Sequence, residues 1–173
     1  MLQDHAKLMQ VFSYAGEIVG RKKLQKMIYI VKKLQFPFNE KYNFHFFGPY
    51  SEELTLRVEE LENNGFLNEQ MEKKGGYVQY RYTLLEEGRE FLKHFQVDMP
   101  HLETCVKNMN EQSSRFLELV STVLYFEDLS KEQVKEKVFT LKFKQRYTDE
   151  EVEQAYQYIE TLRGQTIVMA RSV

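Results

Sequence analysis

One stretch, residues 47–67, constrains the fold of this chain more than any other. It reads FGPYSEELTLRVEELENNGFL, so a Gly-Pro pair and a serine precede an apolar-periodic run, and Asn-Asn-Gly follows that run. Leu54, Val58 and Leu61 recur at i, i+4 and i+7, which predicts an amphipathic helix that Ser51 caps. Asn and Gly tolerate positive φ and end such a helix. The apolar pair that follows predicts a strand directly behind the helix.

Two helices and a short strand are predicted before this stretch. Helical spacing of apolar residues indicates a first helix over residues 4–18 and a second over about 21–35, with Gly and Pro residues ending them. Residues 42–47 are aromatic and partly alternating, which predicts a short strand. Gly48 and Pro49 are then expected to turn the chain.

Behind the central helix, the sequence predicts a β-hairpin and another helix. Residues 66–71 and 77–82 have strand character, and the Lys-Lys-Gly-Gly run at 73–76 is the predicted turn between them. Residues 84–95 return to helical periodicity. The order helix, helix, short strand, helix, strand, turn, strand, helix is typical of a winged helix-turn-helix domain.

The second half is predicted to be helical. Residues 101–126 have apolar residues in steps of four and three, which predicts one long helix with a heptad-like seam. Capping signals predict a helix over about 131–141 and a last helix that begins near Thr148 and ends at Gly164. The predicted fold is therefore α+β, mainly α, with a winged-helix domain at 1–97 and a C-terminal helical domain at 98–173.

The bulk properties exclude several classes of protein. The 173 residues are 42% hydrophobic and 14% aromatic, as in a folded globular chain. No apolar run approaches the ~18–20 residues of a membrane span, and the first ten residues lack a signal-peptide core. The single Cys105 fits a reducing compartment. These features predict a cytoplasmic protein.

Charge is unevenly distributed along the chain. The net charge is −2, but residues 1–50 hold eight basic and three acidic residues, while residues 51–75 hold three and seven. The central helix carries five glutamates against Arg57. A helix in this position of a winged-helix domain ordinarily lies in the major groove of DNA, between two rows of phosphates. The glutamates therefore argue against ordinary groove insertion.

Three motifs follow one another in the first 67 residues: GRKKLQKMIYI at 20–30, GPYSEEL at 48–54 and LENNGFL at 61–67. Together they resemble the uncharacterised YwgA-type winged-helix proteins of Bacillus and related bacteria, over most of the chain. More distantly, the Lys-Leu-Gln-Lys helix and the later Gly-Pro turn are similar to Panacea or SocA-like antitoxin domains. The nearer resemblance implies a fold rather than an activity. The distant one implies binding to a partner protein rather than catalysis.

Two surfaces are candidates for binding nucleic acid. On the second helix, four residues fall within a narrow sector opposite the apolar face, and on the hairpin two lysines lie at the tip. A lysine face with an interleaved tyrosine can contact phosphates and bases, but it is also what an ordinary solvated helix carries. The candidate residues are Lys22, Lys26, Tyr29, Lys33, Lys73 and Lys74.

A third surface is a candidate for binding protein. The exposed side of the acidic helix is expected near Glu53, Arg57 and Glu60, where a basic partner segment would dock. The alternative is a solvated face with a Glu53–Arg57 pair, worth only ~0.3–0.5 kcal/mol. The seam at 101–126 is expected to pack within the chain and against a second copy, as a homodimer.

The sequence offers little for catalysis. Its four histidines are scattered, no Cys or His pair has zinc-like spacing, and no phosphate-binding glycine motif is present. We therefore expect no catalytic residues, no metal site and no cofactor. The function predicted is that of a non-enzymatic regulatory binding protein that acts mainly through a protein partner. The alternative is a DNA-binding transcription regulator that uses the basic second helix and the wing.

Overall fold

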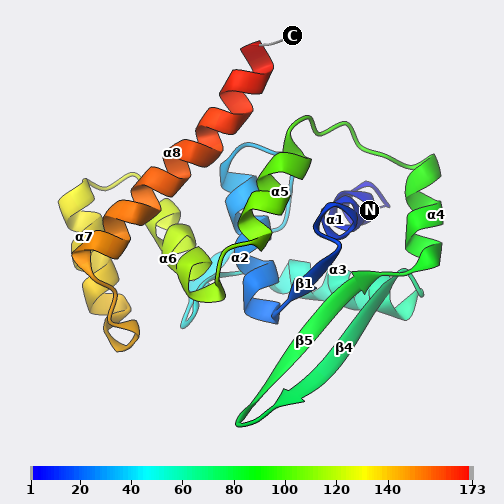
Figure 1. Cartoon of the computed structure of the whole chain (residues 1–173), viewed down its shortest axis with the longest axis horizontal. Coiled ribbons are helices and arrows are strands. Elements are labelled where there is room, and N and C mark those ends of the chain that lie inside the picture. The colour runs from blue at the N-terminus through cyan, green and yellow to red at the C-terminus, as the bar shows by residue number, and fades with distance from the viewer. Residues whose placement is uncertain (1, 172–173) are drawn as a thin grey trace.

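The computed structural model describes residues 2–171, and the side chains of residues 2–166. It is an α+β structure in which helices dominate and one small antiparallel sheet lies to one side (Figure 1). This confirms the predicted fold class. The helices of the first half are α1 (Leu2–Ala15), α2 (Arg21–Lys33), α3 (Glu52–Asn63) and α4 (Glu86–His94).

Three strands form the sheet in the order β1-β5-β4, and all neighbours are antiparallel. The hairpin of β4 (Leu67–Lys74) and β5 (Tyr77–Leu84) is confirmed, with a turn at Gly75 and Gly76. The third strand, β1 (Glu17–Val19), pairs with β5 from Glu17↔Thr83 to Val19↔Arg81. The hairpin extends far beyond the helices, as Figure 1 shows.

The strand β1 was expected to be the end of the first helix, and that prediction was wrong. Gly16 has a φ of 78° and its N–H bonds to Phe12 O at 3.0 Å, which ends α1 four residues before Gly20. Ile18 is fully buried in the strand. Because an apolar residue at this position fits a helical period equally well, periodicity could not separate the two structures.

The aromatic segment before α3 is a small hairpin of β2 (Asn43–His45) and β3 (Gly48–Tyr50). Gly48 and Pro49 therefore lie in a strand and do not form the turn, which consists of Phe46 and Phe47. Both phenylalanines are exposed. Two phenylalanines are not turn-forming residues, so sequence chemistry placed the turn two residues too late.

The predicted long helix at 101–126 is two helices, α5 (Leu102–Asn110) and α6 (Ser114–Tyr125). Ser113 caps α6, because its Oγ accepts a hydrogen bond from Phe116 N at 3.1 Å. Ser113 stands within the predicted heptad seam, but it begins a new helix rather than continuing a single long one. The seam residues on both helices pack inside the chain, where Leu102, Val106 and Val120 are fully buried.

Two capping boxes set the last elements. Ser130 and Gln133 begin α7 (Lys131–Leu141), and Thr148 with Glu151 begins α8 (Asp149–Arg171), both as predicted. A single 3-10 turn, η1 (Phe143–Gln145), joins them. The prediction that Gly164 ends the last helix was wrong, since α8 continues to Arg171. Glycine costs a helix only ~1 kcal/mol and does not have to end it.

One hydrophobic core joins the two halves. It includes Leu8 and Met27 from α1 and α2, and Val106 and Val123 from α5 and α6. In Figure 1, α5 lies beside α1 and α6 lies beside α2, so that the C-terminal helices cover one side of the first two helices. No helix within residues 2–171 is long and apolar enough to cross a membrane.

Candidate functional site: the face between α2 and α3

Two of the sequence motifs meet in space. The Gln25 side chain of α2 forms two hydrogen bonds with the backbone of Ser51: its Nε2 donates to Ser51 O at 2.9 Å, and its Oε1 accepts from Ser51 N at 2.8 Å. The same Nε2 also lies 3.1 Å from Thr55 Oγ1. Both Gln25 and Ser51 are buried. The amide therefore replaces water for both backbone groups of the residue that caps α3.

Lys26 follows Gln25 and is also buried, with only 1% of its surface exposed. Its Nζ donates a hydrogen bond to Pro49 O at 2.8 Å. Gly48 has a φ of 94°, and a Cβ there would lie 3.7 Å from Lys26 Nζ and 3.5 Å from Thr122 Oγ1. A Cβ would fit at these distances, so the positive φ, rather than lack of space, is what favours glycine here. Desolvation by burial lowers the pKa of Lys26 to about 7, although Glu118 opposes this shift.

Glu118 of α6 is the centre of a buried charge cluster. Its carboxylate lies 2.8 Å from Lys22 Nζ and 3.2 Å from Lys142 Nζ, and it accepts a bond from Gln145 Nε2 at 3.2 Å. The side chains of Glu118 and Lys142 are each 1% exposed. Lys142 also donates to Phe46 O at 2.7 Å. The cluster therefore ties α6 and the end of α7 to α2 and to the β2–β3 hairpin.

The lysines of α2 on this face are paired with acidic residues or buried. Lys33 pairs with Glu127 at 3.1 Å, and Glu127 also pairs with Arg163. Tyr29 is buried against Tyr125 and Tyr42. The placement of Lys26 and Tyr29 on the outer face of α2 was wrong, because both are buried and periodicity does not reveal that α6 covers them. Lys22 and Lys33 still expose 38% and 31% of their side chains. Any role of these four residues in binding nucleic acid stays a prediction.

On α3, Glu53 and Arg57 do not pair with each other. Glu53 Oε1 accepts a bond from Lys41 N at 2.6 Å. Arg57 forms an ion pair with Glu40, whose side chain is buried, and lies 3.4 Å from Asp4. These contacts fasten α3 to the segment before the hairpin and to α1. Glu53 and Arg57 are thus held by contacts within the chain.

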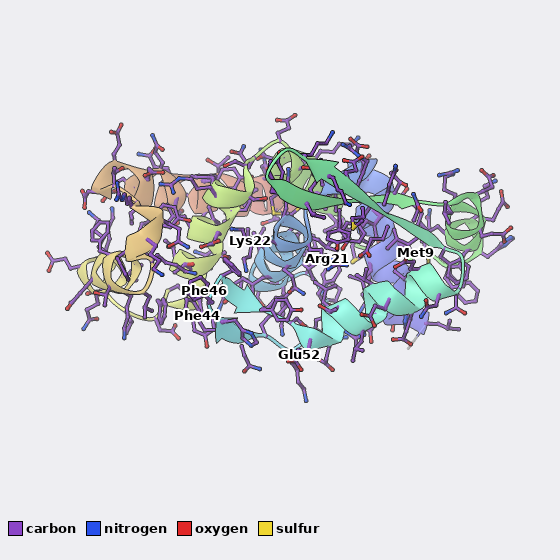
Figure 2. All side chains as sticks on the ribbon, turned by 90° about the horizontal axis from the view of Figure 1, so that it is seen from below. Met9, Arg21, Lys22, Phe44, Phe46 and Glu52 are labelled. Atoms are coloured by element: carbon purple, nitrogen blue, oxygen red, sulfur yellow. The ribbon has the colours of Figure 1, made fainter. Side chains whose placement is uncertain are left out.

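The outer side of α3 remains acidic. Glu60 lies 3.7 Å from His5 Nε2, yet about half of its side chain is exposed. Glu52, Glu59 and Glu62 are exposed, and Leu56 between them is 58% exposed. Figure 2 shows α3 along the lower edge of the molecule in that view, with Glu52 at the first residue of the helix. The acidic character of α3 was predicted from the sequence, but Leu56 was not identified as an exposed residue of this face.

The hairpin tip retains its positive charge. Lys73 and Lys74 are exposed. Farther along the hairpin, Arg81 bonds to Glu72 at 3.0 Å and pairs with Glu17 at 2.5 Å. Of the six residues predicted to bind nucleic acid, four lie on α2. The other two, Lys73 and Lys74, are exposed at the hairpin tip.

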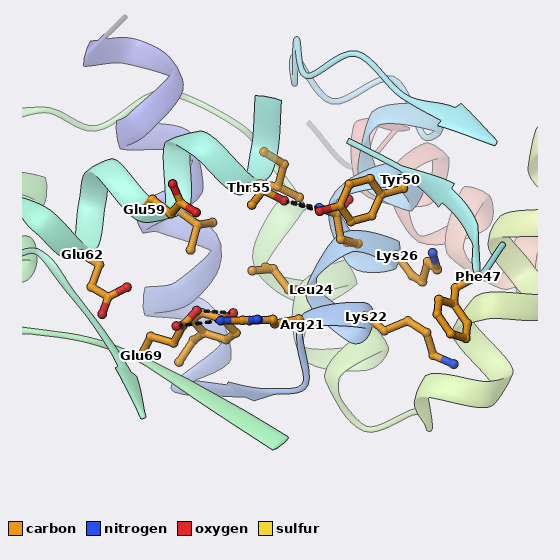
Figure 3. Close-up of a pocket in the computed structure, with 14 residues that line it drawn as sticks. Arg21, Lys22, Leu24, Lys26, Phe47, Tyr50, Thr55, Glu59, Glu62 and Glu69 are labelled. Carbon is orange, nitrogen blue, oxygen red and sulfur yellow. Dashed lines mark hydrogen bonds and ion pairs between the residues drawn. The ribbon is translucent and has the colours of Figure 1, made fainter. Parts of the chain in front are cut away.

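A cavity of about 480 Å³ lies between α2, α3 and the two hairpins. Leu24, Leu54 and Val58 give it an apolar wall, and charged residues stand at opposite ends of it. Figure 3 shows Glu59, Glu62 and Glu69 at one end and Lys22, Lys26 and Phe47 at the other. At the acidic end, Glu69 is already bonded to Arg21 and to Tyr82 Oη. The volume falls within the ~300–1,000 Å³ range of small-molecule sites.

Local sequence patterns indicate only weakly which residues meet in this site. Gln25 and Lys26 stand inside the quoted Lys-Leu-Gln-Lys motif, but a helix pattern does not tell which polar residues face inward. Glu118 lies in the predicted long helix, and Lys142 follows the predicted α7. Their meeting depends on the path of the chain after Pro100, which local patterns do not specify.

Comparison with known proteins gives one relative of high similarity. The chain is 66% identical over 163 residues to the uncharacterized protein YwgA of Bacillus subtilis, strain 168, and the match covers 94% of this chain and 98% of that protein. No protein-family model matches the chain. At this identity and coverage, the chain belongs to the same family as YwgA of Bacillus subtilis.

Proposed function

We propose that this chain is a non-enzymatic, cytoplasmic regulatory binding protein of the winged-helix type, and that it acts through a protein partner docked on α3. The order of α1, β1, α2, α3 and the β4–β5 hairpin, with β1 added to the sheet beside β5, supports the winged-helix assignment. In that arrangement α3 occupies the position of the recognition helix and the β4–β5 hairpin is the wing.

The outer face of α3 is the observation that carries the proposal. It presents Glu52, Leu56, Glu59 and Glu60, which are exposed side chains on one helix. An exposed leucine surrounded by carboxylates suits a basic partner segment that also has one apolar side chain. The apolar contact would supply affinity, and the charges would select the partner and speed its approach.

The same face disfavours DNA. Carboxylates in the major groove would stand within a Debye length of ~8–10 Å of the phosphates, where salt screens their repulsion only in part. The lysines of α2 do not offset this repulsion, because Glu118 and Glu127 pair with Lys22 and Lys33. The partner is therefore proposed to be a protein that docks on α3 and also reaches the C-terminal helices.

DNA binding is kept as a second candidate because of the exposed tip lysines, Lys73 and Lys74. Two lysines release few counterions, so this mode predicts weak binding with little sequence preference. It would place the wing on the phosphate backbone and hold α3 away from the groove.

Cross-linking with an affinity-tagged chain in extract of the source bacterium tests the proposal. The wild type is expected to capture a defined partner, identified by mass spectrometry, and to cross-link it through α3. The double variant Glu59→Lys with Glu60→Lys, and the single variant Leu56→Ser, are expected to lose that partner. All of these positions are exposed or half-exposed, so the variants should unfold at nearly the wild-type denaturant midpoint.

The matched control changes the wing. Lys73→Glu with Lys74→Glu reverses two exposed charges but leaves α3 intact, and it is expected to retain the partner. A mobility-shift titration of random duplex DNA completes the design. Salt-dependent binding by the wild type that the wing variant abolishes, with no partner lost in the α3 variants, would refute the proposal and favour the second candidate.

A further inference from the structure

The cavity between α2 and α3 contains a buried cation that lacks a counterion. Among the described side chains, no carboxylate oxygen lies within 4.0 Å of the Lys26 ammonium. An ammonium group has three N–H donors, and the acceptor found for Lys26 is Pro49 O. Burying a charge without a partner is unfavourable, so this lysine needs an explanation.

The other buried lysines provide a contrast within the same chain. Lys142 is paired with Glu118 at 3.2 Å, and Lys7 lies 3.7 Å from Asp4. Lys26 differs from both in having no ion pair, and it also lines the cavity. A counterion for Lys26 would therefore enter through the cavity, beside the aromatic ring of Phe47 and the ammonium of Lys22.

The rest of the cavity limits what that counterion is attached to. Beyond Lys26, Leu24, Leu54 and Val58 give the wall its apolar part, and the other cation there, Arg21, is already paired with Glu69 at 3.1 Å. At the far end Glu59 and Glu62 are exposed and take part in none of the hydrogen bonds or ion pairs found among the described side chains. These carboxylates repel a second negative charge and attract a positive one. An anion with an apolar body and a cationic far end matches all three regions.

We propose that this cavity binds a small organic monocarboxylate, with its carboxylate at Lys26, its apolar chain against Leu54 and Val58, and a cationic group toward Glu59. This inference goes beyond partner docking and does not depend on it. The site would be an effector site, because its walls are α3, which carries the docking face, and α2, which α6 covers.

The protonation of Lys26 supports the proposal. Burial lowers its pKa to about 7, and the charges of Lys22 and Lys142 act in the same direction while Glu118 acts against it. Across the cavity, α3 contributes Glu59 and Glu62, and β4 contributes Glu69, which is engaged by Arg21. A bound carboxylate would favour the charged lysine, so binding takes up a proton above pH 7.

Three eight-carbon probes of matched length test the site: 8-aminooctanoate, octanoate and octylamine. Each is titrated into the full-length chain, and amide chemical shifts are followed by NMR. The expected order of affinity is 8-aminooctanoate, then octanoate, then octylamine, with the largest shifts in α2 and α3. Tightest binding by octylamine, or shifts confined to other elements, would overturn the proposal.

Two variants identify the groups. Lys26→Met keeps most of the unbranched side chain and removes its charge, so octanoate affinity should fall at least tenfold. Glu59→Lys changes an exposed residue and leaves the core intact. It should remove the preference for 8-aminooctanoate over octanoate. An unchanged preference in Glu59→Lys, or unchanged octanoate affinity in a folded Lys26→Met protein, would each contradict the assignment.

The pH dependence provides a test on the wild type, which needs no substitution. Octanoate is ionised throughout the range from pH 6 to 8.5, so the protonation of Lys26 governs the change in affinity. Affinity should be up to about thirtyfold weaker at pH 8.5 than at pH 6, because the protonated fraction of Lys26 falls by that factor when its pKa is about 7. A flat profile would exclude Lys26 as the counterion. Partner capture by α3 is measured separately, so failure of either proposal leaves the other distinguishable.

Discussion

Replacing Glu118 by glutamine should destabilise the fold strongly, because it removes the negative charge that neutralises two lysines. Glu118 and Lys142 are each 1% exposed and 3.2 Å apart. At an effective dielectric constant of about 20, their attraction is about 5 kcal/mol, which the cost of desolvation offsets in part. Removing one partner of a buried pair costs about 3–5 kcal/mol. We expect Glu118→Gln to lose ~3 kcal/mol, because the amide still bonds its neighbours.

Urea unfolding followed by circular dichroism measures this loss. Glu103→Gln is the matched control, since the same chemical change then removes an exposed i,i+4 pair with Lys107 and should cost no more than ~0.5 kcal/mol. Adding Lys142→Met to Glu118→Gln should recover part of the loss, because the unpaired buried cation is gone. A Glu118→Gln protein within about 1 kcal/mol of wild type would refute the buried-cluster reasoning.

The other predictions concern three elements of the same face. Gln25→Ala should cost about 1–3 kcal/mol in urea unfolding, because it leaves the buried N–H of Ser51 without a partner, whereas Ser51 O still accepts from Thr55 N; an unchanged unfolding midpoint would contradict this. Ser113→Ala should cost ~1 kcal/mol through loss of the α6 cap, and an unchanged midpoint would sink that assignment. The folded pKa of Lys26 is about 7, below its ordinary value of 10.5. The unfolded chain therefore binds more protons between these values, and stability rises with pH there by up to ~1.4 kcal/mol per unit; Lys26→Met should flatten this rise, and an unchanged slope would count against it.

Elements with strong local signals were predictable from the sequence. The helix caps are Ser51, Ser130 and Thr148. Each was predictable because its hydroxyl accepts a hydrogen bond from a backbone N–H only three residues later. The β4–β5 hairpin was predictable for the same reason, since alternation and Gly75-Gly76 are local features. The domain boundary near residue 97 stays a prediction, with core residues from both sides packed together.

The site was less predictable because its key contacts are distant in sequence. Lys22 and Glu118 are 96 positions apart, and so are Phe46 and Lys142, yet each pair is in contact. In the sequence of one helix, a lysine that faces a neighbouring helix has the same spacing from the apolar residues as a lysine that faces water. Only the packing of α6 on α2 separates the two cases.

Because Lys26 is buried and Lys22 and Lys33 are paired with glutamates, α2 presents no free basic surface among the described side chains, and the acidic α3 is left as the binding surface. Acetylation footprinting of the native chain, read by mass spectrometry, tests this most directly. Lys73 and Lys74 are exposed and should react fast, whereas Lys26 should react much more slowly until the chain is unfolded in urea. Native labelling of Lys26 and Lys33 at the rate of Lys73 would mean that α2 presents an open basic surface, and the account would be wrong.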